Sequence, residues 1–155
     1  MVISAIKTMT QKVLWKDSDI IIIDMPPGTG DTQLTFVQEV KIDGAIIVST
    51  PQDLALLDVK RGIQMIEKTG VKILGLIDNM SYFAGDDWKK YKIFGEGGVK
   101  KTAEEFDKEF LDYLPLHEEI RSCAANGQPL TYAKPDHEIS KLFKSIAEKL
   151  KLSFQ

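Results

Sequence analysis

Short apolar runs alternate with helix-sized stretches along this chain, and this alternation limits the folds open to it. The runs are rich in β-branched residues and are bounded by turn-forming residues. They cover residues 20–23, 44–51 and 71–79, and a fourth, shorter run covers 110–116. Runs of this length and composition are typical of strands that are buried on both faces of a sheet. The sequence therefore predicts several buried strands.

The stretches between these runs have the length and pattern of amphipathic helices. The expected helices cover residues 2–14, 32–40, 53–69, 98–108, 117–125 and 136–151. Strands that alternate with such helices form crossover units on a parallel sheet. Residues 84–97 are the least regular stretch, and we expect them to form a surface excursion. The predicted fold class is therefore α/β, with a parallel sheet and flanking helices.

Composition is consistent with one soluble domain. The chain has 155 residues, of which 43% are hydrophobic, and its net charge is −3. This balance gives no reason to expect a nucleic-acid partner, and no apolar run approaches the length of a bilayer span, so stable membrane insertion is not expected. The single cysteine, Cys123, excludes an internal disulfide, and a reducing cytoplasmic location is the simplest interpretation.

Polar segments follow the first three apolar runs, where an open parallel sheet places its ligands. The first of them looks at first like a phosphate-cradling loop. That loop requires G-x-x-x-x-G-K-S/T, and here Met25 stands at the first glycine and Asp31 at the lysine. A carboxylate in place of the lysine repels phosphate. A second glycine-rich stretch, 95–102, has Lys100 in place of its second glycine, so neither stretch is expected to cradle phosphate.

The run 20–23 and the loop after it are better explained as a Walker B strand and a switch loop. Asp24 follows four isoleucines, and a carboxylate at the end of a buried strand is placed to hold Mg²⁺, often through water. In the loop, Gly28, Thr29 and Gly30 would let backbone amides approach a terminal phosphate. An acid that ends a strand before an ordinary Pro-Gly turn is the open alternative.

Four motifs occur in order along the chain. They read IIIIDMPPGTGDTQLT (20–35), DGAIIVSTPQDLALLDVKRGIQM (43–65), GLIDNMSYF (75–83) and IFGEGG (93–98). Together they resemble the Mrp/NBP35 family of P-loop ATPases, which are related to the MinD and ParA proteins and act as carriers or scaffolds for iron–sulfur clusters. The resemblance extends nearly from end to end. It implies a MinD/ParA-like fold, ATP and Mg²⁺ as ligands, and iron–sulfur client proteins as partners.

The family's lysine-rich Walker A loop precedes the region that this chain resembles. The resemblance therefore implies that residues 1–155 are the C-terminal part of a P-loop ATPase domain, that the fold is incomplete, and that the chain alone is inactive. The expected partner is a separate N-terminal half or a second copy in a homodimer. A partition or septum-positioning ATPase is the second choice within the superfamily; such proteins typically carry a C-terminal membrane-binding helix or a DNA-binding surface. The last helix here is basic and amphipathic, which keeps a membrane role open, but ordinary packing against the sheet explains it as well.

Three further residues take roles from the resemblance. Asn79 is similar to the asparagine that reads the adenine edge, and its amide offers a donor and an acceptor; alternatively, it ends a strand in a turn. Pro115 matches a segment that packs near the base, or is a plain loop proline. Asp31 resembles the second acid of the switch loop and would orient water or pair with a lysine; alternatively, it caps a helix that starts near Thr32.

The cluster ligands implied by the resemblance are missing. Many family members carry Cys-x-x-Cys after the Asn-Met-Ser-Tyr-Phe motif, and the pairs of two subunits share a cluster. Here the segment 84–92 contains no cysteine, and Cys123 stands alone. His117 and His137 lack ligand spacing, and we expect them to cap helices or face solvent. The predicted function is an iron–sulfur cluster carrier or assembly ATPase. The alternative is a non-catalytic remnant or partner-binding module.

Overall fold

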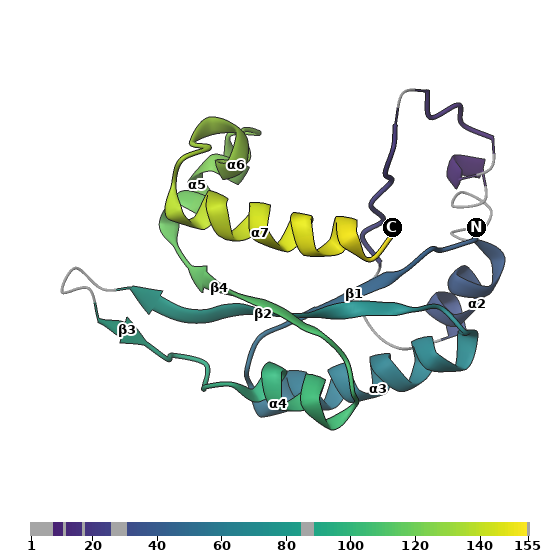
Figure 1. The fold of residues 1–155 in the computed structure, drawn as a ribbon, viewed down its shortest axis with the longest axis horizontal. Coiled ribbons are helices and arrows are strands. Elements are labelled where there is room, and N and C mark those ends of the chain that lie inside the picture. Colours follow the sequence, from purple (N-terminus) through teal and green to yellow (C-terminus); the bar gives the residue numbers. More distant parts are fainter. Residues whose placement is uncertain (1–7, 11, 17, 26–30, 85–88, 155) are drawn as a thin grey trace.

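The computed structural model describes residues 8–10, 12–16, 18–25, 31–84 and 89–154. The elements, in chain order, are α2 (Asp31–Glu39), β1 (Ala45–Ser49), α3 (Asp53–Thr69), β2 (Ile73–Ala84), β3 (Lys90–Tyr91), α4 (Gly98–Glu105), β4 (Phe110–Leu116), α5 (Glu118–Ala125), α6 (Leu130–Ala133) and α7 (Glu138–Leu152). Helices α3 and α4 cover one face of the sheet and α7 lies over the other (Figure 1). The predicted α/β class, with helices on both faces of a sheet, is confirmed.

The sheet is built around β2. In register, Asp78 lies between Ser49 of β1 and Tyr113 of β4, and both pairings are parallel. Further along β2, Phe83 pairs with the short antiparallel strand β3 on one side and with β4 on the other. The parallel core is therefore as predicted, but the sheet is mixed. The expected surface excursion at 84–97 is partly wrong, because β2 continues to Ala84 and β3 pairs back onto its end.

Two apolar layers hold the sheet and helices together. Successive residues of β2 face opposite sides, as the strand period of two requires: Leu76 packs toward α3 and α4, and Ile77 packs toward α7. Leu76 and Ile63 of α3 are completely buried. Removing a side chain of that size from water stabilises the fold by about 1.5–3 kcal/mol. The two layers fix β2 at the centre of the molecule.

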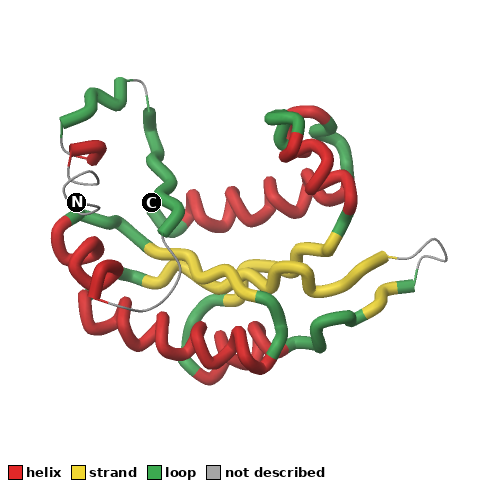
Figure 2. The backbone as a smooth tube through the Cα atoms, turned by 180° about the vertical axis from the view of Figure 1, so that it is seen from behind, coloured by secondary structure: helices red, strands yellow, loops and turns green. Residues whose placement is uncertain are grey.

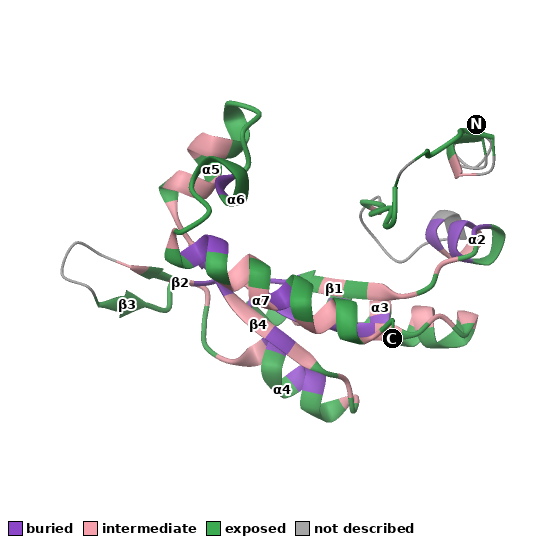
Figure 3. Ribbon diagram, turned by 45° about the horizontal axis from the view of Figure 1, so that its top comes forward, coloured by how far each residue is buried: buried purple, intermediate pink, exposed green. Residues whose placement is uncertain are grey.

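The predicted strand at 20–23 is wrong for this structure. Residues 18–25 form no strand, and Ile22 is 90% exposed. A strand is stable only beside another strand that satisfies its backbone groups, and within the described ranges no strand pairs with this run. Figure 2 shows it as a loop outside the sheet, and Figure 3 shows it as exposed. Asp24 is therefore an exposed residue of this loop.

The outer edge of β1 is open among the described strands. Among the described strands, β1 pairs only with β2. Its Ile47 packs against the layer under α3, whereas Val48, on the opposite face, is 55% exposed. Helix α7 packs on β4 and β2 and does not cover β1. The run 44–51 was expected to be buried on both faces, and it is buried on one.

Most predicted helices are present within a few residues. Helix α3 matches the predicted range and ends at Gly70, whose left-handed backbone (φ 77°) suits glycine. The expected helix 2–14 falls mostly on residues that the structure leaves undescribed; residues 8–10 are helical and 12–16 are not. The short helix α6 was not predicted. Among the described helices none has both the length and the apolar character that crossing a membrane requires.

Candidate functional site

The carboxyl ends of β1, β2 and β4 meet at one edge of the sheet because the three strands are parallel. Asn79 lies opposite Leu114 in the β2–β4 ladder, so Asn79 and the next residue of β4, Pro115, are brought together at this edge. Ligands of open parallel sheets bind beyond such an edge. The structure thus places two of the predicted base-binding residues side by side, although they are far apart in the sequence.

The backbone around Asn79 has an unusual conformation. Asn79 is half-buried, and its amide forms no hydrogen bond with the described residues, so its donor and acceptor are both open to a ligand. The next residue, Met80, has a left-handed backbone (φ 55°), a conformation that costs about 1–3 kcal/mol in a non-glycine residue and clusters at functional sites. The buried Ser81 hydroxyl donates to the Leu114 carbonyl at 3.0 Å and fixes this bend against β4.

The structural alternatives for Asn79 and Pro115 are not supported. Asn79 does not end a strand, because β2 continues to Ala84. Pro115 is not a loop residue, because it lies buried within β4. Proline has no backbone N–H and is tolerated in edge strands, and β4 pairs only with β2 among the strands described here. Both residues therefore belong to the sheet edge itself.

Among the predicted metal and phosphate residues, the structure describes the side chain of Asp24 alone. Asp24 is exposed in a loop outside the sheet. Gly28, Thr29 and Gly30 lie outside the described residues, and Asp31 begins α2 with a side chain that is not described. Within the described ranges, no group of three or more His, Cys, Asp or Glu side chains is placed to hold a metal ion. The described residues do not fit Mg²⁺, whereas the amide of Asn79 offers a hydrogen-bond donor and an acceptor to a ligand.

The glycine-rich segment 93–98 lies close to Pro51, which follows β1. A Cβ added to Gly98 would lie 3.0 Å from the backbone oxygen of Pro51, and one added to Gly95 would lie 3.3 Å from the same atom. Only residues without a side chain allow this close approach. The IFGEGG motif therefore brings backbone to the carboxyl edge of the sheet, beside the segment that follows β1.

Asp78 is a residue of this edge whose burial the sequence analysis missed. Its side chain is 0% exposed, and neither carboxylate oxygen has a hydrogen-bond partner among the described residues. Burial raises the pKa of Asp78 to about 6, and the positive charge of Lys92 opposes this shift in part. One feature of the sequence could have indicated this burial: Asp78 directly follows the apolar run ILGLI and precedes Asn79.

The two histidines cap helices, as predicted. His117 Nδ1 accepts a hydrogen bond from the Glu119 backbone N–H, and His137 Nδ1 accepts one from the Ile139 N–H, both at 3.2 Å. Although distant in sequence, their rings lie 5.6 Å apart between centroids, and His137 Nε2 lies 3.3 Å from Glu119 Oε2. Cys123, in the adjacent α5, is partly buried and unpaired in the described part of the chain.

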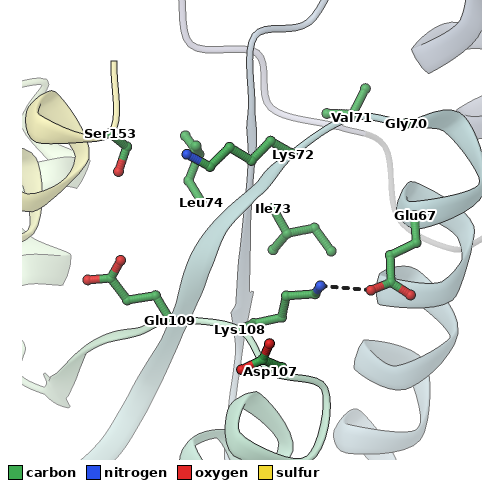
Figure 4. A pocket seen from close by; sticks show the side chains of 10 residues that line it. All are labelled: Glu67, Gly70, Val71, Lys72, Ile73, Leu74, Asp107, Lys108, Glu109 and Ser153. Atoms are coloured by element: carbon green, nitrogen blue, oxygen red, sulfur yellow. Dashed lines mark ion pairs between the residues drawn. The ribbon is translucent and has the colours of Figure 1, made fainter. Parts of the chain in front are cut away.

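A hollow with no part in this edge lies elsewhere in the molecule. It has a volume of about 650 Å³ and is formed where α3 ends, β2 begins and the turn before β4 passes (Figure 4). Its walls carry mixed charges, and Lys108 Nζ is ion-paired with Glu67 Oε1 at 2.8 Å. Because it faces the amino ends of the parallel strands, it has no part in the candidate site.

Comparison with known proteins identifies related chains. Residues 1–151 match the family model described as "ParA: NUBPL iron-transfer P-loop NTPase". The chain is 40% identical over 147 residues to an iron-sulfur cluster carrier protein of Escherichia coli K12, covering 94% of this chain and 40% of that protein. It is 43% identical over 151 residues to the mouse iron-sulfur cluster transfer protein NUBPL, covering 97% and 47%. The chain thus spans less than half the length of these relatives.

Solved structures show the same fold. A nucleotide-binding protein from Archaeoglobus fulgidus, in complex with ADP, superimposes with a TM-score of 0.74 at 35% identity, covering 82% of this chain and 53% of that one. The cell division ATPase MinD of Pyrococcus furiosus superimposes with a TM-score of 0.69 over 97% of this chain and 56% of that one. At 23% identity the second comparison concerns the fold alone.

Proposed function

This chain belongs to the ParA family of NUBPL iron-transfer P-loop NTPases, and from that premise we propose that it is the base-binding and switch portion of an ATP-dependent iron–sulfur cluster carrier. In this proposal residues 1–155 form the C-terminal part of a P-loop ATPase domain. The phosphate loop comes from another segment, because this sequence contains no G-x-x-x-x-G-K-S/T motif.

The placement of Asn79 beside Pro115 is the observation that carries the proposal. These residues lie at the carboxyl edge of the parallel strands, and the Asn79 amide is open to a ligand. An amide that both donates and accepts matches the edge of an adenine. The buried Pro115 offers an apolar contact for the flat face of the base. The ADP complex of the Archaeoglobus fulgidus protein, which has the same fold, supports a nucleotide as the ligand.

The remaining predicted residues would act once the sheet is completed. A neighbouring strand would let residues 20–23 join a sheet and bring Asp24 to its carboxyl edge as the carboxylate that holds Mg²⁺ beside the phosphate oxygens. The metal ion would neutralise charge on the phosphates. Gly28, Thr29 and Gly30 would present backbone amides to the terminal phosphate, and Asp31 would orient water or pair with a lysine.

In this proposal the iron–sulfur cluster is the group that is transferred, and a single copy of this chain has too few thiolate ligands to bind it. Iron–sulfur clusters are usually held by four thiolates, whereas this sequence contains only Cys123. Two copies in a homodimer would supply two thiolates. We therefore propose that the remaining ligands come from another segment or from the iron–sulfur client protein.

A partner-binding module without ATPase activity is the second candidate function. Three features favour it: the exposed run 20–23, the exposed Val48, and the edge of β1 that no described strand pairs with. Exposed apolar strands and open edges promote association with other chains. On this alternative the chain binds a partner through its open edge, and no nucleotide is hydrolysed.

Reconstitution separates the two functions. The chain is mixed with the N-terminal half of the E. coli relative, and Mg²⁺-dependent ATP turnover is compared with that of each half alone. We expect turnover only in the mixture, a loss of tenfold or more in Asp24→Asn, and no change in the exposed control Asp43→Asn. For Asn79→Ala we expect weaker nucleotide binding, by about tenfold if one good hydrogen bond to the base is lost. A complex that forms without turnover would establish the partner-binding module instead.

Anaerobic reconstitution with iron and sulfide tests whether the chain binds a cluster. We expect the chain alone to form no stable brown chromophore, because it offers too few thiolates. A stable chromophore that is lost in Cys123→Ser would show that this cysteine is a cluster ligand and that two copies suffice.

A further inference from the structure

A second hollow, with a volume of about 370 Å³, lies between the end of β2, the strands β3 and β4, and α7. Its charged walls are formed by two acids, Asp78 of β2 and Asp112 of β4, and by two cationic side chains, Lys90 and Lys92. The hydroxyl residue Ser81 of β2 also lines it. Asn79 and Pro115 do not line it. It is therefore distinct from the proposed base-binding residues, and its volume falls at the lower end of the range for small-molecule sites.

Asp78 is an unsatisfied acceptor in the wall of this hollow. Its carboxylate is completely buried, and neither oxygen has a hydrogen-bond partner among the described residues. Leaving such a group unpaired costs free energy, and an orphaned buried polar group in a folded protein calls for an explanation. A ligand that donates hydrogen bonds to this carboxylate would remove the cost.

Of the two lysines that line the hollow, Lys90 and Lys92, only one is ion-paired with an acid among the described residues. Lys92 Nζ is ion-paired with the exposed Glu96 Oε1 at 2.7 Å. Lys90 Nζ lies 4.4 Å from the centroid of the Tyr82 ring, and within the described residues it has no carboxylate partner. The hollow thus combines a buried carboxylate that has no hydrogen-bond partner with an ammonium group that has no carboxylate partner, both among the described residues. The other acid of its lining, Asp112, accepts a hydrogen bond from the Tyr113 backbone N–H.

We propose that this hollow binds a small amino carboxylate, with the ligand's ammonium group on Asp78 and its carboxylate on Lys90. The ammonium group of a simple amine would be repelled by Lys90, and a simple carboxylate would be repelled by Asp78. A ligand with only one of these charges therefore pairs with one wall and is repelled by the other. Only a molecule with both charges satisfies both groups. Tyr82 and Tyr113 also line the hollow.

Binding of defined probes to the full chain tests this site. The probes are glycine, β-alanine, 4-aminobutanoate and 5-aminopentanoate at millimolar concentration, with butylamine and butanoate as singly charged controls, and binding is measured by ligand-observed NMR and calorimetry at neutral pH. We expect saturable binding of at least one amino carboxylate and none of the two controls. Binding should not be displaced by ATP, because the hollow does not include Asn79.

Three variants separate recognition from folding. Asp78→Asn keeps the shape of the side chain and removes its charge, and it should weaken binding about tenfold or more. Lys90→Gln, near the surface, should weaken binding to a similar degree without affecting the fold, while Asp43→Asn, an exposed acid elsewhere, should bind as the unmodified chain does. Circular dichroism confirms that each variant is folded. Absence of saturable binding for every probe, or undiminished binding in folded Asp78→Asn and Lys90→Gln, would overturn the proposal.

Discussion

The buried carboxylate of Asp78 should make the stability of this protein fall as the pH rises from about 4 to about 6. Asp78 is 0% exposed, and burial raises its pKa from 3.8 to about 6. Between these two values the folded chain keeps the proton and the unfolded chain releases it. The folded state therefore binds more protons in this range, and the free energy of unfolding decreases with increasing pH.

The size of the effect follows from the shift itself. A difference of about two pKa units corresponds to about 3 kcal/mol, because each unit is worth ~1.36 kcal/mol. This stabilisation is fully present below the unfolded pKa and is lost as the pH rises through the folded value of about 6. Above that pH the folded chain carries the desolvated charge, and Lys92 offsets only part of its cost.

Urea unfolding of the unmodified chain and of Asp78→Asn, followed by circular dichroism from acid to neutral pH, measures this effect. Asparagine does not titrate, so the difference between the two pH profiles isolates Asp78, while the titration of other acids cancels. We expect the difference to change by about 3 kcal/mol over this range, within a factor of two. In the exposed control, Asp43→Asn, the profile should parallel that of the unmodified chain. If the Asp78→Asn profile is also parallel, Asp78 has an ordinary pKa and the argument from burial is wrong.

Substitutions at three further positions, with two control variants, test the packing and capping by the same unfolding measurement. Leu76→Ala, at a fully buried position, should cost about 2–5 kcal/mol, whereas Leu54→Ala, at a side chain that is 77% exposed, should change stability by less than about 0.5 kcal/mol; equal losses would contradict the assigned core. Gly75→Ala should cost about 1–3 kcal/mol, since its Cβ would lie 2.6 Å from Leu111 Cγ, and an unchanged midpoint would show that the strands can separate. His137→Ala should cost about 1 kcal/mol through loss of the cap of α7, and His137→Asn should restore most of it; equal stability of both would argue against the cap.

Local patterns in the sequence were sufficient for most of the framework. The β-branched runs at 44–51, 71–79 and 110–116 became β1, β2 and β4, and the stretch 53–69 became α3 with the same bounds. Once those strands were assigned as parallel, their carboxyl ends had to meet at one edge. This reasoning placed Asn79 at that edge, whereas the place of Pro115 beside it was implied by the family resemblance and is seen in the ladder of β2 and β4.

Features that depend on contacts between distant segments required the tertiary structure. The run 20–23 has the local pattern of a buried strand, but a strand also needs a neighbour for its backbone groups, and none pairs with it within the described ranges. The pairing of β3 with the end of β2 and the approach of His117 to His137 likewise join residues that no local pattern connects. Asp78 shows the same distinction, because its residue type was evident in the sequence, but the desolvation that shifts its pKa arises only when strands and helices pack around it.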